Sequence, residues 1–149
     1  MEFRKDASAG YLANHMARLF ARELQARIKP LGLSTGTFPA LLELWAEDGL
    51  TQRQLVERLD VEQATMANTL ARMERDGLIR RSRDAADGRA QRILLTEAAR
   101  ALRGPALAAA SEVNGLALAG LSEAQRAHLL ALMRGVIGTL GGQASPKAG

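Results

Sequence analysis

The chain has 149 residues, a formal net charge of +4, a sequence pI near 10.3 and no cysteine. This length suits one domain with its own core, and the lack of cysteine excludes disulfides, cysteine-ligated zinc and thiol redox sensing. The two histidines, His15 and His128, are far apart in the sequence, so we expect neither an enzyme nor a bound metal or cofactor. No segment reads as a signal peptide or reaches the roughly 20 apolar residues of a membrane span, which predicts a cytoplasmic protein without a membrane partner.

Two helices are expected before residue 50, after a loose arm over residues 1–7. The first covers residues 8–30 and has an apolar stripe at helical spacing. Its members are Leu12, Met16, Leu19, Phe20, Leu24 and Ile28. Ser34 is expected to cap a second helix that reaches about Asp48. Because Pro39 has no amide hydrogen, that helix should kink or begin later.

The stretch from Leu50 to Thr96 predicts two short helices followed by a basic hairpin. Thr51 and Gln54 form a capping-box pattern at the start of a helix over residues 51–59. A second helix over residues 62–76 should end at Gly77, where a left-handed residue is needed. Its inward positions are Met66, Leu70 and Met73, and its outward positions are Gln63, Thr65, Asn68 and Arg72.

The expected hairpin has strands over residues 78–82 and 91–95, with Asp87-Gly88 as the turn signal. Five arginines stand against two aspartates between residues 80 and 92. Two helices joined by a tight turn, with a basic hairpin behind them, predict a winged helix-turn-helix. The second helix of such a unit fits the major groove, and the wing can place arginine on the backbone or in the minor groove.

Thr96 should cap an alanine-rich helix over residues 97–118, bent at Gly104-Pro105. A last helix is expected to begin after Ser122, which should cap it with Gln125 in the capping-box position, and a small, loose tail follows over residues 141–149. The apolar stripe of this last helix consists of Leu129, Leu130, Met133, Val136, Ile137 and Leu140. The terminal helices are more apolar than a lone winged helix requires, and a second copy of the chain is the economical partner for them.

The central block resembles the MarR (multiple antibiotic resistance regulator) family of transcription factors. The resemblance is carried by Leu50-Thr51-Gln52, by the run from Glu74 to Arg81, and by Asp87-x-Arg89 followed by Leu95-Thr96. Gly88 departs from the family pattern, which usually has a basic or bulkier residue there. The resemblance implies a mainly α fold with a small β-hairpin wing. One domain would then have dimerisation helices over residues 8–30 and 97–140 around a DNA-binding lobe over residues 34–96.

For DNA contact we single out the outward residues of the second helix of this block together with two wing arginines. These residues are Gln63, Thr65, Asn68, Arg72, Arg83 and Arg89. The alternatives are an ordinary solvated helix face and a charged hairpin held by local ion pairs. Arg92 lies on a strand whose exposed face is not settled by the pattern, and the resemblance gives Asp87 the role of bracing Arg89.

The resemblance also implies a small aromatic or phenolic effector. The candidate residues for binding it are Tyr11, His15, Arg18, Phe38 and Trp45, since a cation beside aromatic walls suits a carboxylate or phenolate. The alternative is that Phe38 and Trp45 belong to the core and that Arg18 is a surface charge.

The sequence therefore predicts a homodimeric, sequence-specific regulator of transcription. It would bind double-stranded DNA at a pseudo-palindromic operator and repress until a small aromatic or lipophilic ligand releases it. One alternative is a winged-helix module that binds protein. Another is a ligand-independent DNA-binding regulator that competes with other DNA-coating proteins.

Overall fold

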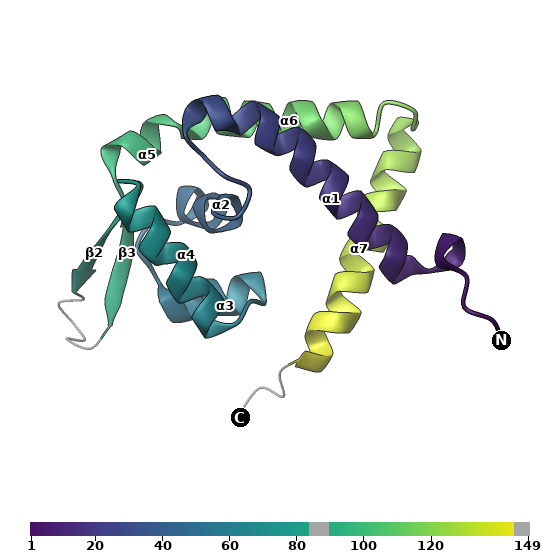
Figure 1. The fold of residues 1–149 in the computed structure, drawn as a ribbon, viewed down its shortest axis with the longest axis horizontal. Coiled ribbons are helices and arrows are strands. Elements are labelled where there is room, and N and C mark those ends of the chain that lie inside the picture. Colours follow the sequence, from purple (N-terminus) through teal and green to yellow (C-terminus); the bar gives the residue numbers. More distant parts are fainter. Residues whose placement is uncertain (84–89, 145–149) are drawn as a thin grey trace. The chain divides into compact units, whose positions relative to one another are not determined.

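The computed structural model describes residues 1–83 and 90–144, with side chains described as far as residue 141. The chain divides into two compact units, Met1–Val113 and Asn114–Gly149. Figure 1 shows the elements, which in chain order are η1 Lys5–Ala7, α1 Ala9–Ile28, η2 Lys29–Leu31, α2 Phe38–Ala46, β1 Leu50–Thr51, α3 Gln52–Leu59, α4 Gln63–Arg75, β2 Ile79–Arg83, β3 Gln91–Leu95, α5 Glu97–Ala101, α6 Arg103–Ala117 and α7 Glu123–Ala144. The prediction of a mainly α fold with a winged helix-turn-helix is confirmed.

The sheet is antiparallel and has the strand order β1-β3-β2. Ile79 pairs with Leu95 between β2 and β3, and Leu50 pairs with Ile93 between β1 and β3. The two-residue strand β1 was not predicted, because a strand of two residues has no alternation that a sequence pattern could detect. It ties the start of α3 to the hairpin.

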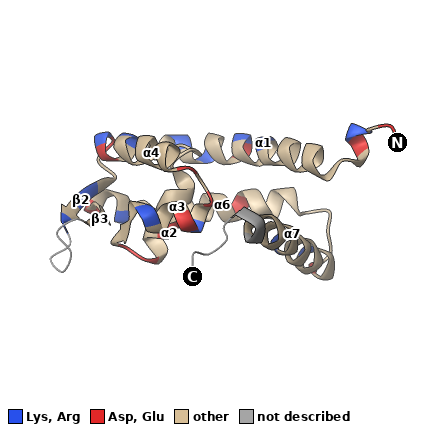
Figure 2. Cartoon of the chain, turned by 90° about the horizontal axis from the view of Figure 1, so that it is seen from below, with Lys and Arg blue, Asp and Glu red and all other residues tan. Residues whose placement is uncertain are grey.

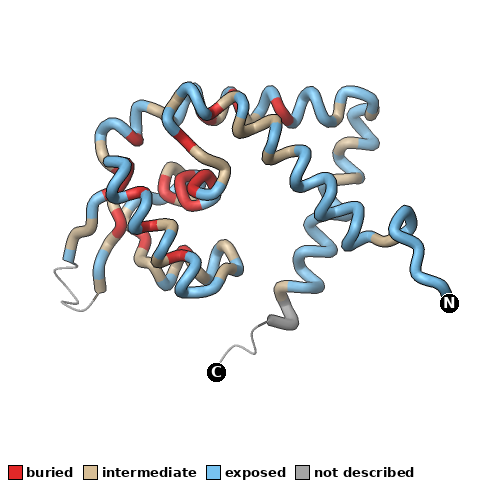
Figure 3. The backbone as a smooth tube through the Cα atoms, in the orientation of Figure 1, coloured by how far each residue is buried: buried red, intermediate tan, exposed pale blue. Residues whose placement is uncertain are grey.

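The core of the first unit lies in the winged lobe, which we define as residues 38–95, and in the helix ends that pack on it. Figure 3 shows the buried residues gathered on α2, α4 and the strands. The largest fully buried side chains are Ile28, Leu41, Leu44, Leu50, Leu55, Leu70, Met73 and Ile93, together with Thr37. Burying each large apolar side chain contributes roughly 1.5–3 kcal/mol, so this cluster holds the α3–α4 pair against the sheet.

Local caps close several helix ends, and those at Thr51, Gly77 and Thr96 were predicted. Ser8 accepts a hydrogen bond from the Tyr11 amide at the start of α1, and Thr51 and Gln54 form a complete capping box on α3. Gly77 has a φ of +74° after α4, a left-handed conformation that is inexpensive only without a β-carbon. The hydroxyl of Thr96 caps α5 by accepting from the Ala99 amide.

Three boundaries differ from the predictions. Helix α2 begins at Phe38 rather than at Ser34, because Pro39 fits the first turn of a helix, where its missing N–H costs nothing. The break in the following helix falls at Leu102, between α5 and α6, so Pro105 sits in the first turn of α6. Helix α7 continues through Gly141 to Ala144, where the loose tail had been expected; residues 145–149 lie outside the described residues.

The second unit contains the last residues of α6, the connection that follows them, and α7. Ser122 and Gln125 exchange a reciprocal pair of hydrogen bonds of 2.9 and 3.2 Å at the start of α7, which confirms the predicted capping box. None of residues 123–141 is buried. No helix in the described part of the chain is both long and apolar enough to cross a bilayer.

Candidate nucleic-acid interface

Helix α4 has one buried and one exposed face. Met66, Leu70 and Met73 are at most 3% exposed and anchor it in the core, as their spacing predicted. Asp60, with a φ of +53°, makes the tight turn from α3; aspartate tolerates this conformation better than most residues. The α3–turn–α4 arrangement is that of a helix-turn-helix whose second helix is open on its outer side.

The four α4 residues predicted to contact DNA all lie exposed: Gln63, Thr65, Asn68 and Arg72. The sequence reading overlooked Arg75, which is also exposed and lies two helical turns after Asn68 on the same face. The predicted helix over residues 62–76 already included Arg75, and its spacing of seven residues from Asn68 was the signal that could have found it. Figure 2 shows basic residues on α4 and on the hairpin strands.

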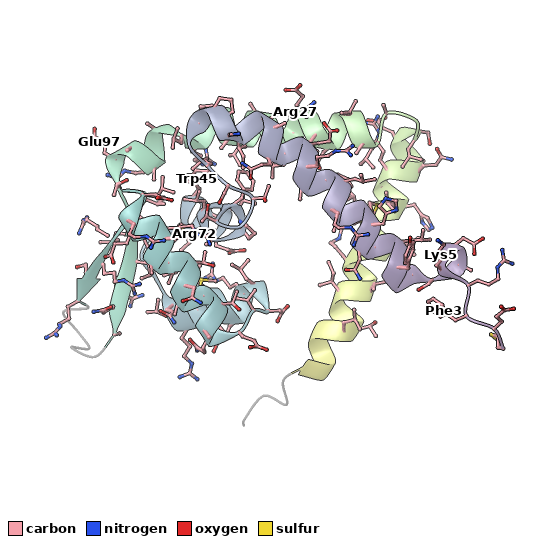
Figure 4. All side chains as sticks on the ribbon, in the orientation of Figure 1. Phe3, Lys5, Arg27, Trp45, Arg72 and Glu97 are labelled. Carbon is pink, nitrogen blue, oxygen red and sulfur yellow. The ribbon has the colours of Figure 1, made fainter. Side chains whose placement is uncertain are left out.

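Arg72 lies against the segment that connects α1 to α2 (Figure 4). Its Nη1 is 3.6 Å from the place that a β-carbon would take on Gly36. Gln25 of α1 holds the same segment, because its Oε1 accepts from the Thr35 amide at 3.0 Å and its Nε2 donates to the Leu33 carbonyl at 3.3 Å. The guanidinium of Arg72 is therefore placed beside a loop that α1 itself fixes.

The wing arginines divide into two kinds. Arg81 is half-buried, with its Nε 3.6 Å from Oε1 of Glu74 on α4, and Arg92 donates from Nη1 to the Gly49 carbonyl at 3.2 Å. These two hold the hairpin against α4 and β1. Arg80 and Arg83 are exposed on β2.

The predicted roles of Arg89, Asp87 and Gly88 fall outside the described residues, as does the hairpin turn itself. Among the residues that the structure describes, Arg75, Arg80 and Arg83 have no carboxylate partner. Together with Arg72, they form the part of this surface that is free to meet an anionic partner.

Asp48 fixes the base of the wing and was not singled out in the sequence. Its Oδ1 accepts from the amide of Leu95 on β3 and from the Gly49 amide, both at 2.9 Å. The side chain thus continues the β1 edge of the sheet by about one residue. The sequence predicted only that the second helix would reach about Asp48.

The five candidate ligand residues fall into two separate groups, three on α1 and two on α2. Tyr11 and His15 meet edge to face on the exposed side of α1, with ring centroids 6.4 Å apart, and Arg18 is exposed one turn further along. Phe38 is 4% exposed and meets Trp45 edge to face at 6.0 Å. Trp45 donates from Nε1 to the Ala99 carbonyl at 3.0 Å, so this pair packs within the core of the winged lobe.

A shallow hollow of about 400 Å³ lies in the second unit, at the start of α7. It is lined by Leu121, Ala124, Gln125, His128, Leu129 and Leu132. None of the five candidate ligand residues is among them.

The shifted pKa values belong to ion pairs that join helices. A hydrogen bond from Arg27 lowers the pKa of Glu23 on α1, and Glu23 and then Glu112 of α6 raise the pKa of Arg27. Glu47, followed by Glu43, raises the pKa of Arg58, which links α3 to α2. These groups are structural, and within the described residues no group of three or more His, Cys, Asp or Glu is placed to hold a metal.

The family model described as "MarR family" matches residues 31–90. An HTH-type transcriptional repressor of Mycobacterium tuberculosis (strain H37Rv) is 30% identical over 102 residues, which are 68% of this chain and 73% of the relative. The chain belongs to the MarR family. The family prediction made from the central block is thereby confirmed, and the relatives are regulators rather than enzymes.

Solved MarR-type structures share the fold at lower identity. A putative MarR family regulator from Listeria monocytogenes, solved in complex with a 26-mer DNA, has a TM-score of 0.84 at 21% identity and covers 91% of each chain. An organohalide-sensing regulator in its 2,4-dichlorophenol-bound form has a TM-score of 0.87 at 22% identity, covering 97% of this chain and 86% of its own. The chain spans 45–62% of the length of several other curated relatives.

Proposed function

We propose that this MarR family protein is a homodimeric regulator that binds double-stranded DNA sequence-specifically and represses transcription from a pseudo-palindromic operator. The observation that carries the proposal is the outer face of α4. It is exposed, polar and basic, and it lies opposite a face that is fully committed to the core. In this proposal Gln63, Thr65 and Asn68 face base edges, and Arg72 and Arg83 face phosphate, with Arg89 of the wing beside them.

The dimer is supported by apolar side chains that remain exposed in the single chain. On α1 they are Tyr11, Leu12, Met16 and Leu19; on α7 they are Leu130, Leu132, Met133, Val136, Ile137 and Leu140, with exposures between 37% and 66%. Contiguous apolar patches of this kind mark interaction sites, and a twofold partner offers the same surface in return. Two recognition helices would then read half-sites about 34 Å apart.

Repression and its relief are proposed with support from relatives. The Mycobacterium tuberculosis relative is named as a repressor, and the 2,4-dichlorophenol complex belongs to a regulator of the same fold. A small aromatic anion would meet Tyr11, His15 and Arg18 on the exposed side of α1. Phe38 and Trp45 would take part only if the ligand displaced their contacts in the core. The ligand would release DNA by favouring a dimer in which the recognition helices are wrongly spaced.

The proposal predicts how strongly salt should weaken DNA binding. Arg72, Arg75, Arg80 and Arg83 are exposed in each protomer, so a dimer could neutralise about eight phosphates. The plot of log K against log salt should then have a slope of about −7. A protein-binding winged helix would have no such slope on duplex DNA.

The test is fluorescence anisotropy of a labelled duplex taken from upstream of the protein's own gene, with a scrambled duplex as control, at two salt concentrations. Tighter binding of the first duplex with steep loss in salt supports the proposal, and aromatic acids are then titrated into the complex. Equal, weak binding of both duplexes refutes regulation at that site and favours the protein-interaction alternative.

A further inference from the structure

A side-chain hydrogen bond joins the first residues of the two helices of the helix-turn-helix. Gln52 opens α3 and Gln63 opens α4. Nε2 of Gln52 donates to Oε1 of Gln63 at 3.3 Å. Gln52 is half-buried and Gln63 is exposed, and Gln63 makes no other side-chain hydrogen bond to the described residues.

This bond distinguishes the two ends of the Gln63 amide. A glutamine side chain has an oxygen that only accepts and an NH2 group that only donates. If the Gln63 amide alone turned over, its NH2 would face the NH2 of Gln52, and two donors would oppose each other. In this arrangement the oxygen faces Gln52 of α3, and the NH2 group is the end that stays available to a further partner.

We propose that Gln52 is a positioning residue for base recognition, which presents the Gln63 NH2 group to DNA and selects the base that Gln63 meets. This inference rests on the proposed function. In the major groove, guanine offers N7 and O6 as acceptors and adenine offers N7, whereas cytosine offers only its N4 amino donor. A Gln63 amide held by Gln52 therefore prefers a purine to cytosine at that position.

Three substitutions at residue 52 should have three different outcomes. Gln52→Lys keeps a donor against Oε1 and keeps the purine preference. Gln52→Ala removes the bond, so the amide turns freely and the preference relaxes. Gln52→Glu offers only acceptors, attracts the NH2 group and turns the oxygen outward, so cytosine or the adenine N6 amino group becomes favoured. A residue with a merely structural role would not separate lysine from glutamate in this way.

Alanine, lysine and glutamate are all good helix formers, and the neighbouring capping box of Thr51 and Gln54 does not involve residue 52. The matched control is Arg53→Ala on the same turn. The Arg53 side chain is 81% exposed and pairs with Glu57. Its loss should weaken binding to all sequences alike and leave base preference unchanged.

The experiment selects duplexes from a random-sequence pool with the full chain and sequences the bound fraction. Gln63→Ala identifies the position that Gln63 reads, because preference there is lost. At that position Gln52→Ala should lower the ratio of purine to cytosine by about fivefold or more. Gln52→Glu should bring the ratio of guanine to cytosine below one, because guanine offers only acceptors there. Adding Gln52→Ala to Gln63→Ala should change nothing further, as expected when one residue acts through the other.

The inference is overturned if Gln63→Ala alters a base preference but the residue 52 variants do not, or if lysine and glutamate behave alike. It is also overturned if Gln52→Ala still shifts the preference in the Gln63→Ala background. In those cases the wild-type chain still enriches an operator, so the proposed function stands. Enrichment of no sequence by the wild-type chain would instead remove the proposed function and this inference with it.

Discussion

The carboxylate of Asp48 offers the sharpest test of how the wing is held. Asp48→Ala removes the acceptor for the Leu95 and Gly49 amides. The Gly49 amide also donates to the Ile93 carbonyl at 3.1 Å, so it keeps a partner. The Leu95 amide would lose its bond on the β1 side of β3, beside a side chain that is only 3% exposed.

The expected loss of stability in Asp48→Ala follows from the one amide that is left without a partner. Leaving one buried donor unsatisfied costs about 1–3 kcal/mol. The Asp48 side chain is 36% exposed, so water can partly replace it, and we expect the lower half of the range, about 1–2 kcal/mol. Asp48→Asn keeps Oδ1 as an acceptor and should cost less than half as much.

Urea unfolding followed by circular dichroism, at equal protein concentrations because a dimer's stability depends on concentration, measures both variants. DNA affinity of Asp48→Ala should also fall, since the hairpin loses its register at the base. The reasoning is refuted if Asp48→Ala unfolds at the wild-type urea midpoint, or if asparagine is as damaging as alanine.

Three further predictions concern the core, the dimer and pH. Trp45→Phe should cost about 1 kcal/mol by losing the hydrogen bond to the Ala99 carbonyl, measured by circular dichroism because this is the only tryptophan; no change would remove Trp45 from the core network. Val136→Glu places a charge on a side chain that is 59% exposed in one chain, so the dimer should dissociate in analytical ultracentrifugation, whereas Arg134→Ala should not; a dimer intact in both would put the interface elsewhere. Because Arg27 lowers the pKa of Glu23 below its ordinary 4.5, that pair stabilises the fold above pH 4.5 and its contribution disappears as pH falls through the folded pKa. The difference in melting temperature between the wild type and Glu23→Gln should therefore shrink below pH 4.5, and a constant difference would contradict the assignment.

Helix ends were predictable wherever one residue satisfies a local need. Thr51, Gly77 and Thr96 act within three residues of themselves, by capping an amide or by adopting a left-handed backbone. Such effects are written into the local sequence and need no tertiary partner. The inward face of α4 was predictable for a similar reason. Residues that recur every three or four positions lie on one face of a helix, so apolar residues at that spacing identify the buried face.

Contacts between distant segments were not predictable. Asp48 reaches Leu95 across 47 positions, and Arg81 of the hairpin pairs with Glu74 of α4 only once both elements are folded. The number of wing arginines could be read from the sequence. That Arg81 and Arg92 hold the wing, while Arg80 and Arg83 face outward, is seen only in the structure. A count of cations therefore overstates how many are available to phosphate.

The link between α1 and the recognition helix shows why this matters for regulation. Gln25 makes both of its hydrogen bonds to residues 33–35, and the next residue, Gly36, lies under the guanidinium of Arg72. If α1 shifts along its axis, either these hydrogen bonds break or the loop moves with the helix and changes the support of Arg72. Each hydrogen bond contributes about 1 kcal/mol, and an effector alters operator affinity only by its differential affinity for two such arrangements. A ligand that met Tyr11, His15 and Arg18 would therefore act on the same helix that carries Gln25, and Gln25 in turn holds the loop beside Arg72.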